Sequence, residues 1–355
     1  MKNLKCFMKK SMLKPVAFII LSFLSSATWS TDLKLWYNSP AKDWHEALPI
    51  GNSHLGGMLY GGTEREELQL NESTFWAGSP HQNNSRNAVY VLPVVRQLIF
   101  EGKNAEAQRL VDANFLTGQN GMPYLTLGSL YIDFPEHKNV SNYYRDLNLS
   151  DATCSTRYTV NGVNYYRTTF ASLTDGVIVM HIRADKAKSL NFKIGYDCEL
   201  QHQVTSQNRK LLITCQGKDH EGVKAGLHAD CIVEVKTNGE VNFSGDKLNV
   251  DAASEATIYI SAATNYVNYH DISGNSFEKA NSVLEKAMQM PYEEVLKKHI
   301  CFYQNEFNRV ELNLASNKSS EDETTERIKN FSKGGDMAMA ALQFQFGRYL
   351  LISCS

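Results

Sequence analysis

The feature that most constrains the fold of this 355-residue chain is a long succession of short strand-like segments between Tyr124 and Thr264. The segments alternate apolar and polar residues, and turn-forming residues separate them at short intervals. Asn161-Gly162 and Asn238-Gly239 each predict a hairpin, because both residue types accept the positive φ of a type I′ turn. Many short strands with this punctuation predict a mainly β fold, a large two-sheet β-sandwich rather than a small immunoglobulin-like one.

An insert near residues 93–115 interrupts the β pattern with apolar residues at helical spacing. Pro93 is suited to a first helical position, and Gly102 predicts a break between two short helices. We expect this insert to pack on a sheet.

From Ser276 onward the apolar residues again recur at helical spacing. Ser276 can cap a first helix, and Pro291 can open a second one. A last helical segment, Met337 to Ile352, is apolar on much of its surface. An exposed apolar patch of that size promotes association or local disorder, so we expect this helix to be poorly ordered or to bind another copy.

The first residues have the pattern of a secretory signal peptide. Lysines precede a short apolar core, Pro15 to Leu24, and the small residues Ser25 to Ala27 follow it. The core is too short for a membrane helix, and a buried N-terminal helix is the alternative interpretation. The pattern predicts a signal peptide over residues 1–27 and a periplasmic or secreted protein, without a lipid anchor because Cys6 precedes the apolar core.

The net charge does not favour a nucleic-acid or membrane partner, and the cysteine spacing does not favour a metal site. The formal net charge is −2, which offers no electrostatic attraction for a nucleic acid or an anionic membrane, and no later apolar run has the length of a membrane span. The six cysteines after Cys6 show no C-x-x-C spacing and no nearby histidine in metal-ligand register. We therefore expect no metal and no cofactor, and cysteines that are mostly buried free thiols.

The stretch from Trp44 to Pro80 carries the candidate site. Two glycine pairs, Gly56-Gly57 and Gly61-Gly62, are suited to tight turns or bulges between short strands. An aromatic and amide cluster follows, and its members are Asn71, Glu72, Phe75 and Trp76. Side chains of these types stack on sugar faces and bind hydroxyl groups. Phe75 and Trp76 are also typical of residues that fill a core, and the chemistry alone favours that interpretation slightly while leaving both open.

Several motifs in this order resemble one known family. The runs Trp44-x-Glu46-Ala47-Leu48-Pro49-Ile50-Gly51-Asn52-x-x-Leu55-Gly56 and Leu70-Asn71-Glu72-x-Thr74-x-Trp76-x-Gly78 are similar to the N-terminal domain of glycoside hydrolase family 95, the α-L-fucosidases. Further matching stretches are Leu98 to Lys103, Leu127 to Phe134, Tyr144 to Leu149, Phe170 to Ser172, Tyr292 to Leu312 and Leu342 to Ser353. The resemblance spans nearly all of the chain after the signal peptide.

The resemblance implies an arrangement of domains. It implies a many-stranded "supersandwich" over residues 31–270, a helical linker over 276–330 and the first helix of an (α/α)6 barrel over 331–355. In the family, a glutamate acid and an asparagine base assisted by an aspartate lie on that barrel. No position of this chain matches those motifs, so no catalytic residue is carried over. We therefore expect a fragment whose sandwich lacks the catalytic barrel as its packing partner.

The function that the resemblance implies is that of an exported α-L-fucosidase. Such an enzyme hydrolyses terminal α-L-fucosyl linkages of glycans, α-1,2 linkages especially, with inversion of configuration. Asn71, Glu72 and Trp76 are the candidate substrate-binding residues, at a domain boundary or sugar pocket. Whether this chain is itself an enzyme stays open, since the catalytic centre is expected elsewhere. The alternatives are a non-catalytic carbohydrate-binding or interaction sandwich and a related α-L-galactosidase.

Overall fold

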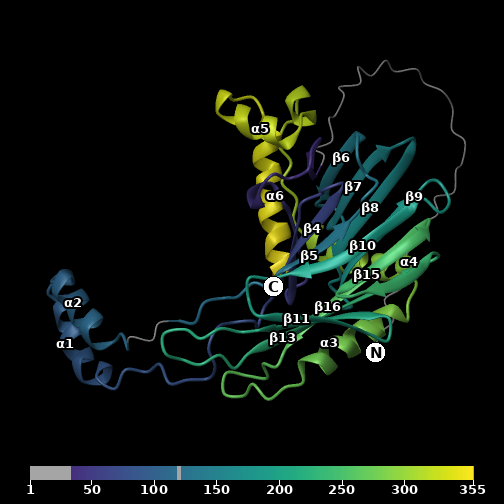
Figure 1. Cartoon of the computed structure of the whole chain (residues 1–355). Coiled ribbons are helices and arrows are strands. Elements are labelled where there is room, and N and C mark those ends of the chain that lie inside the picture. Colours follow the sequence, from purple (N-terminus) through teal and green to yellow (C-terminus); the bar gives the residue numbers. More distant parts are fainter. Residues whose placement is uncertain (1–32, 118–120, 355) are drawn as a thin grey trace, which may run out of the picture.

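Two antiparallel sheets form the body of the molecule in a computed structural model that describes residues 33–117 and 121–354 (Figure 1). The larger sheet has nine strands. In spatial order they are β1 (Lys34–Tyr37), β6 (Ser141–Asn148), β7 (Thr153–Val160), β8 (Val163–Ala171), β9 (Ile178–Ala184), β16 (Glu255–Thr264), β13 (His228–Thr237), β12 (Lys210–Gln216) and β11 (His202–Gln207).

The smaller sheet has seven strands and packs against the first. In spatial order they are β14 (Glu240–Ser244), β15 (Lys247–Ala253), β10 (Leu190–Asp197), β5 (Ser129–Asp133), β4 (Arg65–Glu72), β3 (Leu55–Leu59) and β2 (Leu48–Gly51). The predicted large two-sheet sandwich is confirmed. The predicted signal peptide over residues 1–27 lies outside the described residues.

The main core lies between the two sheets, and alternation within the strands builds it. In β4 the buried residues recur at every second position, so that Leu68 and Leu70 point inward. β16 differs because it is buried along almost its whole length. Its inner face contributes Ile258 and Ile260 to the main core, and its outer face contributes Tyr259 to a second core beneath two helices.

The Asn161-Gly162 hairpin is confirmed. It joins β7 to β8, and both of its residues have positive φ, 50° and 74°, as a type I′ turn requires.

The second predicted hairpin, Asn238-Gly239, is wrong. β13 before it belongs to the nine-stranded sheet and β14 after it belongs to the seven-stranded sheet, so the pair is a crossover between sheets. The Asn238 amide oxygen accepts hydrogen bonds from the backbone of Ser254 and Glu255, 2.9 and 3.2 Å long. A Cβ on Gly239 would lie 2.5 Å from the Asp251 carbonyl oxygen, so glycine here permits close packing.

Two helices, α3 (Ser276–Met288) and α4 (Tyr292–Phe307), cover the outer face of the nine-stranded sheet. Both helices were predicted, but the predicted N-cap of α3 is wrong. Asn275, rather than Ser276, is the N-cap: its side chain accepts a hydrogen bond from the Glu278 amide, while the Ser276 hydroxyl donates to Asp230. Pro291 directly precedes α4, as predicted.

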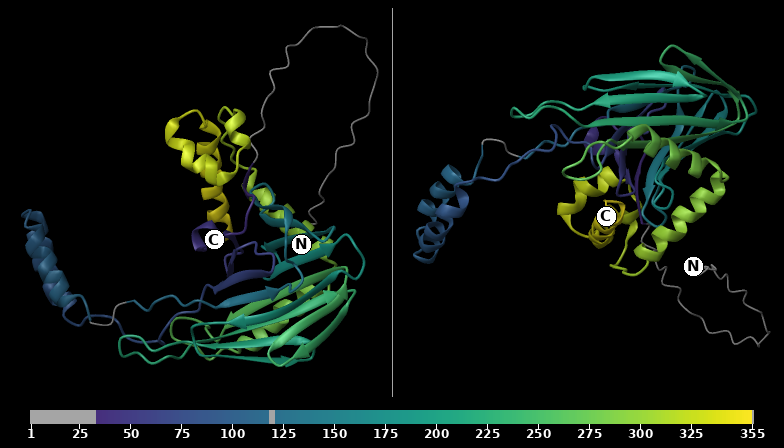
Figure 2. Two further views of the ribbon diagram at one scale, coloured as in Figure 1. Left: turned by 45° about the horizontal axis from the view of Figure 1, so that its top comes forward. Right: turned by 90° about the horizontal axis from the view of Figure 1, so that it is seen from below.

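The helical insert consists of α1 (Ala88–Phe100) and α2 (Asn104–Asn114), separated near Gly102 as predicted. Pro93 does not open the first helix but lies inside it, because the helix already begins at Ala88. The expected packing on a sheet is also wrong. In every view α1 and α2 lie against each other as an arm that projects away from both sheets (Figures 1 and 2).

The C-terminal part contains α5 (Thr324–Asn330), α6 (Met337–Cys354) and two short 3-10 helices, Lys318–Glu321 and Phe331–Lys333; a third 3-10 helix, Trp44–Glu46, lies between β1 and β2. α6 lies beside the strand pair β2–β3 (Figure 2), where the Tyr349 hydroxyl donates to the Pro49 carbonyl over 2.7 Å. One side of this helix is therefore buried against the sandwich, which the sequence did not lead us to expect. Met337, Phe344 and Leu351 remain exposed on its other side.

All six cysteines within the described ranges are free, as predicted, and half of them are buried. Among the described residues, no helix is long and apolar enough to span a membrane.

Candidate functional site

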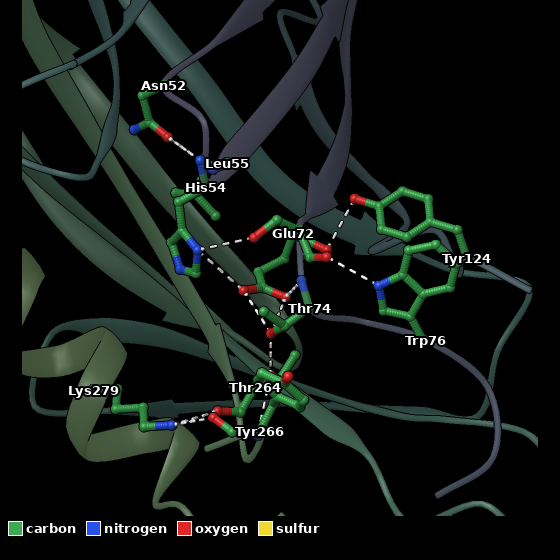
Figure 3. A network of polar contacts seen from close by, with 11 residues as sticks. Asn52, His54, Leu55, Glu72, Thr74, Trp76, Tyr124, Thr264, Tyr266 and Lys279 are labelled. Atoms are coloured by element: carbon green, nitrogen blue, oxygen red, sulfur yellow. Dashed lines mark hydrogen bonds and ion pairs between the residues drawn. The ribbon is translucent and has the colours of Figure 1, made fainter. Parts of the chain in front are cut away.

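Glu72, the last residue of β4, organises the candidate site (Figure 3). Its side chain is fully buried, and both carboxylate oxygens accept hydrogen bonds from Thr74: the backbone N–H donates over 2.8 Å, and the hydroxyl lies 2.9 to 3.0 Å away. The Glu72 carbonyl accepts the Tyr124 hydroxyl at 2.9 Å. These bonds fix the turn that carries the chain from β4 to Trp76.

His54 reaches the same carboxylate from the turn between β2 and β3. Its Nδ1 lies 3.3 Å from Glu72 Oε1 and 3.3 Å from the Ser73 hydroxyl oxygen. The register that pairs Leu55 with Glu72 across β3 and β4 places this turn beside the loop. Sequence reasoning missed His54, although the glycine pairs that indicated adjacent short strands could have pointed to this proximity.

The turn that carries His54 is held from two sides. The Asn52 side-chain oxygen accepts the backbone N–H groups of His54 and Leu55 over 3.2 and 2.7 Å, and its amide nitrogen donates to the Ser172 carbonyl. Ser53 has a left-handed backbone, φ 68°, and its N–H donates to the Ser353 carbonyl of α6 over 2.7 Å. Asn52 thus joins the residue that follows β8 to the site, and Ser53 joins α6 to it.

Burial raises the pKa of the Glu72 carboxyl, and the nearby His54, the Thr74 donors and Lys279 oppose that rise. Lys279 on α3 donates to the carbonyl oxygens of Thr264 and Tyr266 over 3.3 and 2.7 Å. The Glu72 side chain is buried and its oxygens hold the Thr74 turn, so its described contacts give it a positioning role. Its contact with substrate stays a prediction.

The structure decides between a core role and an exposed role for Phe75 and Trp76, and the outcome differs for the two residues. Phe75 is fully buried in the main core, whereas Trp76 is 43% exposed. The indole N–H of Trp76 donates to the Ser73 carbonyl over 3.0 Å, and the ring meets Tyr124 edge-on with centroids 5.1 Å apart. The Trp76 side chain is therefore held in one orientation while part of it remains accessible.

Three hollows meet around this loop, with volumes of about 190, 180 and 600 Å³. Asn71, which bonds Tyr124, lines the first beside α6, and His54, Glu72 and Lys279 line the second. The largest hollow holds the aromatic and polar side chains of Trp76, Tyr266, Tyr269, His81, Asn83 and Asn268. The structure thus places Asn71 and Glu72 at the end of β4 and Trp76 on the loop that follows, each at a different hollow.

Glu72 is the single carboxylic acid among the described residues that line these hollows. A pair of facing carboxyl groups, which glycoside hydrolysis uses in most families, is therefore not formed there by the described part of the chain. The described residues also contain no group of three or more metal-ligand side chains. This geometry suits sugar contact and loop positioning.

Comparison with protein-family models matches most of the chain. Residues 35–269 match the model described as "Glycosyl hydrolase family 65, N-terminal domain". Residues 291–355 match the model described as "Glycosyl hydrolase family 95 catalytic domain". The second match begins at the start of α4, well before α6.

Two curated relatives carry fucosidase names. "Alpha-L-fucosidase 2" of Arabidopsis thaliana is 31% identical over 92% of this chain and 42% of its own length. "Probable alpha-fucosidase A" of Aspergillus niger is 26% identical over 90% of this chain and 43% of its own length. The chain thus spans less than half the length of these relatives.

A solved structure with the description "Putative kojibiose phosphorylase from human microbiome" aligns over 85% of this chain and 41% of that chain. The two are 11% identical, with a TM-score of 0.47. The assignment of the fold rests on the two observed sheets.

Proposed function

This chain belongs to the family of glycosyl hydrolase family 65 N-terminal domains, whose model covers residues 35–269, and from this premise we propose that it forms part of a fucosidase-like glycoside hydrolase. The match of residues 291–355 to a family 95 catalytic domain supports the proposal, as do the fucosidase names of relatives aligned over nine-tenths of the chain. The substrate on this proposal is a fucosylated oligosaccharide or glycan.

The finer chemistry is hydrolysis of terminal α-L-fucosyl groups, α-1,2-linked ones especially, with inversion. In inversion an acid protonates the leaving oxygen while a base directs water to the opposite face of the sugar. We assign neither role to a described residue, because Glu72 is enclosed and the hollows offer no second carboxyl group among the described residues.

The observation that carries a sugar-binding role for the sandwich is the fixed, partly exposed ring of Trp76. It lies at the hollow of about 600 Å³, which also holds the exposed ring of Tyr269. Apolar C–H faces of sugars pack on aromatic rings, and the hydroxyl groups bind neighbouring amides such as that of Asn83. We assign Trp76 to substrate contact, and Asn71 and Glu72 to the shape of its loop.

A second role for the chain is to support a helical domain. The arm exposes Tyr90 and Phe100, and α6 exposes Phe344 and Leu351. Exposed apolar surface of this extent is typical of an interaction site. The remainder of a family 95 catalytic domain is the partner that suits it. Export to the periplasm or the exterior, which rests on the signal-peptide pattern of residues 1–27, completes the proposal.

The test combines turnover and binding. The chain is incubated with 2′-fucosyllactose, and binding of the same sugar is measured by calorimetry. We expect binding without turnover, and Trp76→Ala should weaken the binding about tenfold through loss of the stacking surface. Trp44→Ala is the matched control, since Trp44 is 54% exposed and lines none of the three hollows, and it should leave binding unchanged.

Either of two results contradicts this assignment. Clear turnover by the chain would place catalytic groups within it, and equal binding by the Trp76→Ala and Trp44→Ala variants would remove Trp76 from the site. The alternative function is a non-catalytic carbohydrate-binding sandwich, which the aromatic hollow also favours. That alternative predicts equally tight binding of oligosaccharides without fucose, whereas a fucosidase component favours fucosylated ones.

A further inference from the structure

Two asparagine-glycine pairs of this chain share their composition but differ in their surroundings. Asn161-Gly162 forms the turn between β7 and β8, and Asn238-Gly239 forms the crossover between β13 and β14. Both asparagines are exposed, so exposure does not distinguish them. Asparagine is a thermolabile residue, and it is most labile before glycine, which lacks the Cβ that would shield its backbone nitrogen from the asparagine side chain.

The asparagine amide of the β7–β8 turn is unrestrained within the described part of the chain. Hydrogen bonds from the described residues reach neither the Asn161 side chain nor the Gly162 N–H. A Cβ on Gly162 would have no atom within 4 Å, so the tip of the turn stands clear of the rest of the molecule. The amide carbon and the backbone nitrogen that could attack it are therefore both free to move together.

The strand ends beneath this turn are held firmly, which confines any opening to its tip. The Asn164 side chain donates to Asp185 over 2.6 Å and accepts the Thr159 hydroxyl over 2.7 Å, and the Asn164 N–H donates to Asp185 over 2.9 Å. Tyr158 and Tyr165 are buried in the main core. The two turn residues can therefore change their backbone angles without exposing the core, at a small local free-energy cost.

The crossover pair, in contrast, is held at both groups that the same reaction needs. The Asn238 side-chain oxygen accepts the backbone N–H groups of Ser254 and Glu255. The Gly239 N–H donates to the Thr237 hydroxyl oxygen over 3.1 Å. A Cβ on Gly239 would also lie 2.7 Å from that of Ala253, so the backbone here has little room to rotate. Attack of the Gly239 nitrogen on the Asn238 amide therefore requires several contacts to break first.

We propose that Asn161 is a site of spontaneous deamidation, at which the native chain acquires aspartate or isoaspartate, and that the fold protects Asn238 from the same reaction. The Gly162 backbone nitrogen loses its proton to solvent and attacks the Asn161 Cγ. The Cγ–Nδ2 bond breaks, ammonia leaves and a cyclic succinimide remains. Water then opens the ring at either carbonyl group. In sum, an amide and a water molecule become a carboxylate and an ammonium ion, without oxidation or reduction.

The product changes the hairpin in two ways. Each event adds a negative charge at the exposed tip, and isoaspartate also adds a methylene group to the main chain of a turn that pairs Val160 with Val163. The isoaspartyl carboxylate lies where the chain is exposed, so an isoaspartyl methyltransferase can serve as a probe for it.

The experiment incubates the native chain at mildly alkaline pH, maps its peptides by mass spectrometry and labels isoaspartyl groups with the methyltransferase. Asn161 should deamidate roughly tenfold faster than Asn238, because the crossover pair must first break its hydrogen bonds. In denaturing urea the two rates should agree within about threefold, since both asparagines precede glycine. Equal rates in the native chain, or faster reaction at Asn238, would overturn the proposal. The pair Asn120-Gly121 begins outside the described residues, and its peptide is scored separately.

Two variants locate the protection. Thr237→Val keeps the shape of the side chain but removes the acceptor of the Gly239 N–H, so it should speed deamidation at Asn238 by roughly fivefold and leave Asn161 unchanged. Asn161→Gly suits the same turn and should abolish the isoaspartyl label at this hairpin. A label that persists there, or an Asn238 rate that Thr237→Val leaves unaltered, contradicts the proposal. The comparison of native and urea-unfolded chains uses no variant, so it decides the matter even if Thr237→Val does not fold.

Discussion

The two helix pairs of this molecule differ in how far their apolar side chains are buried. α3 and α4 cover the nine-stranded sheet and bury Leu284 and Val295 completely. α1 is also apolar, yet its Tyr90 is 79% exposed and its Phe100 is 88% exposed. α3 and α4 pack on the sandwich, whereas α1 and α2 project from it as an arm (Figure 1).

This difference shows what helical periodicity determines and what it leaves open. The pattern of apolar residues decides where a helix forms and which of its faces is apolar. It does not decide which surface covers that face, and burial supplies most of the stability of a protein helix. Four predictions test how far the two pairs differ, beginning with the largest effect.

Leu284→Ala should cost roughly 3 to 4 kcal/mol of unfolding free energy, because it leaves a cavity in the second core between α3 and the sheet. Urea denaturation measures the loss. A cost below about 1 kcal/mol would mean that the packing of α3 on the sheet contributes little, and the contrast between the two pairs would fail.

The attachment of α4 should depend on pH through His299. This residue is buried, its ring nitrogens lie near the Leu173 N–H and the Ala152 carbonyl, and burial lowers its pKa to about 4. Between about pH 6.5 and about pH 4 the unfolded chain binds a proton at His299 that the folded chain does not, so stability falls as the pH falls. From about pH 7 to about pH 5 we expect a loss of about 2 kcal/mol.

His299→Gln isolates that contribution, because the buried His137 also has a pKa of about 4 and adds its own pH dependence. The difference between the wild-type and variant unfolding free energies should shrink by about 2 kcal/mol across the same range. A difference independent of pH would exclude His299 as its source.

Pro93→Ala should stabilise the arm locally by about 1 kcal/mol, since alanine restores a backbone N–H that can bond the carbonyl of Val89. Hydrogen exchange of α1 amides measures the effect as a slowing of roughly fivefold, while amides of α3 remain unchanged. Equal slowing in both helices would indicate that the arm and the sandwich open together.

Phe100→Ala should change the unfolding free energy by less than about 0.5 kcal/mol, the smallest effect of the four, because the side chain is almost fully exposed. Denaturation under the conditions used for Leu284→Ala makes the two directly comparable. A loss similar to that of Leu284→Ala would show that Phe100 is covered in solution, for instance by a second copy.

The sequence predicted features that depend on neighbouring residues. The strands, the Asn161-Gly162 turn, the break near Gly102 and the start of α4 after Pro291 all follow from local backbone preferences and periodicity. The number of strands was sufficient to predict two packed sheets, because so many half-buried strands need two facing layers to cover their apolar sides.

Features that depend on distant residues could not be read in the same way. Asn238-Gly239 has the composition of a hairpin, but the following strand pairs with β15 in the other sheet, which only the tertiary structure decides. The contact of His54 with Glu72 likewise arises from the register of β3 on β4. Of the candidate site, the sequence identified the segment from Asn71 to Trp76, but neither the residues that hold it nor the exposure that distinguishes Trp76 from Phe75.

The bond between the Ser53 N–H and the Ser353 carbonyl has a mechanical consequence for the loop. A Cβ on Gly51 would lie 2.8 Å from the same carbonyl oxygen, so the end of α6 fits against this turn with no free space. Any axial shift of α6 must therefore displace the turn, and with it the imidazole that touches Glu72.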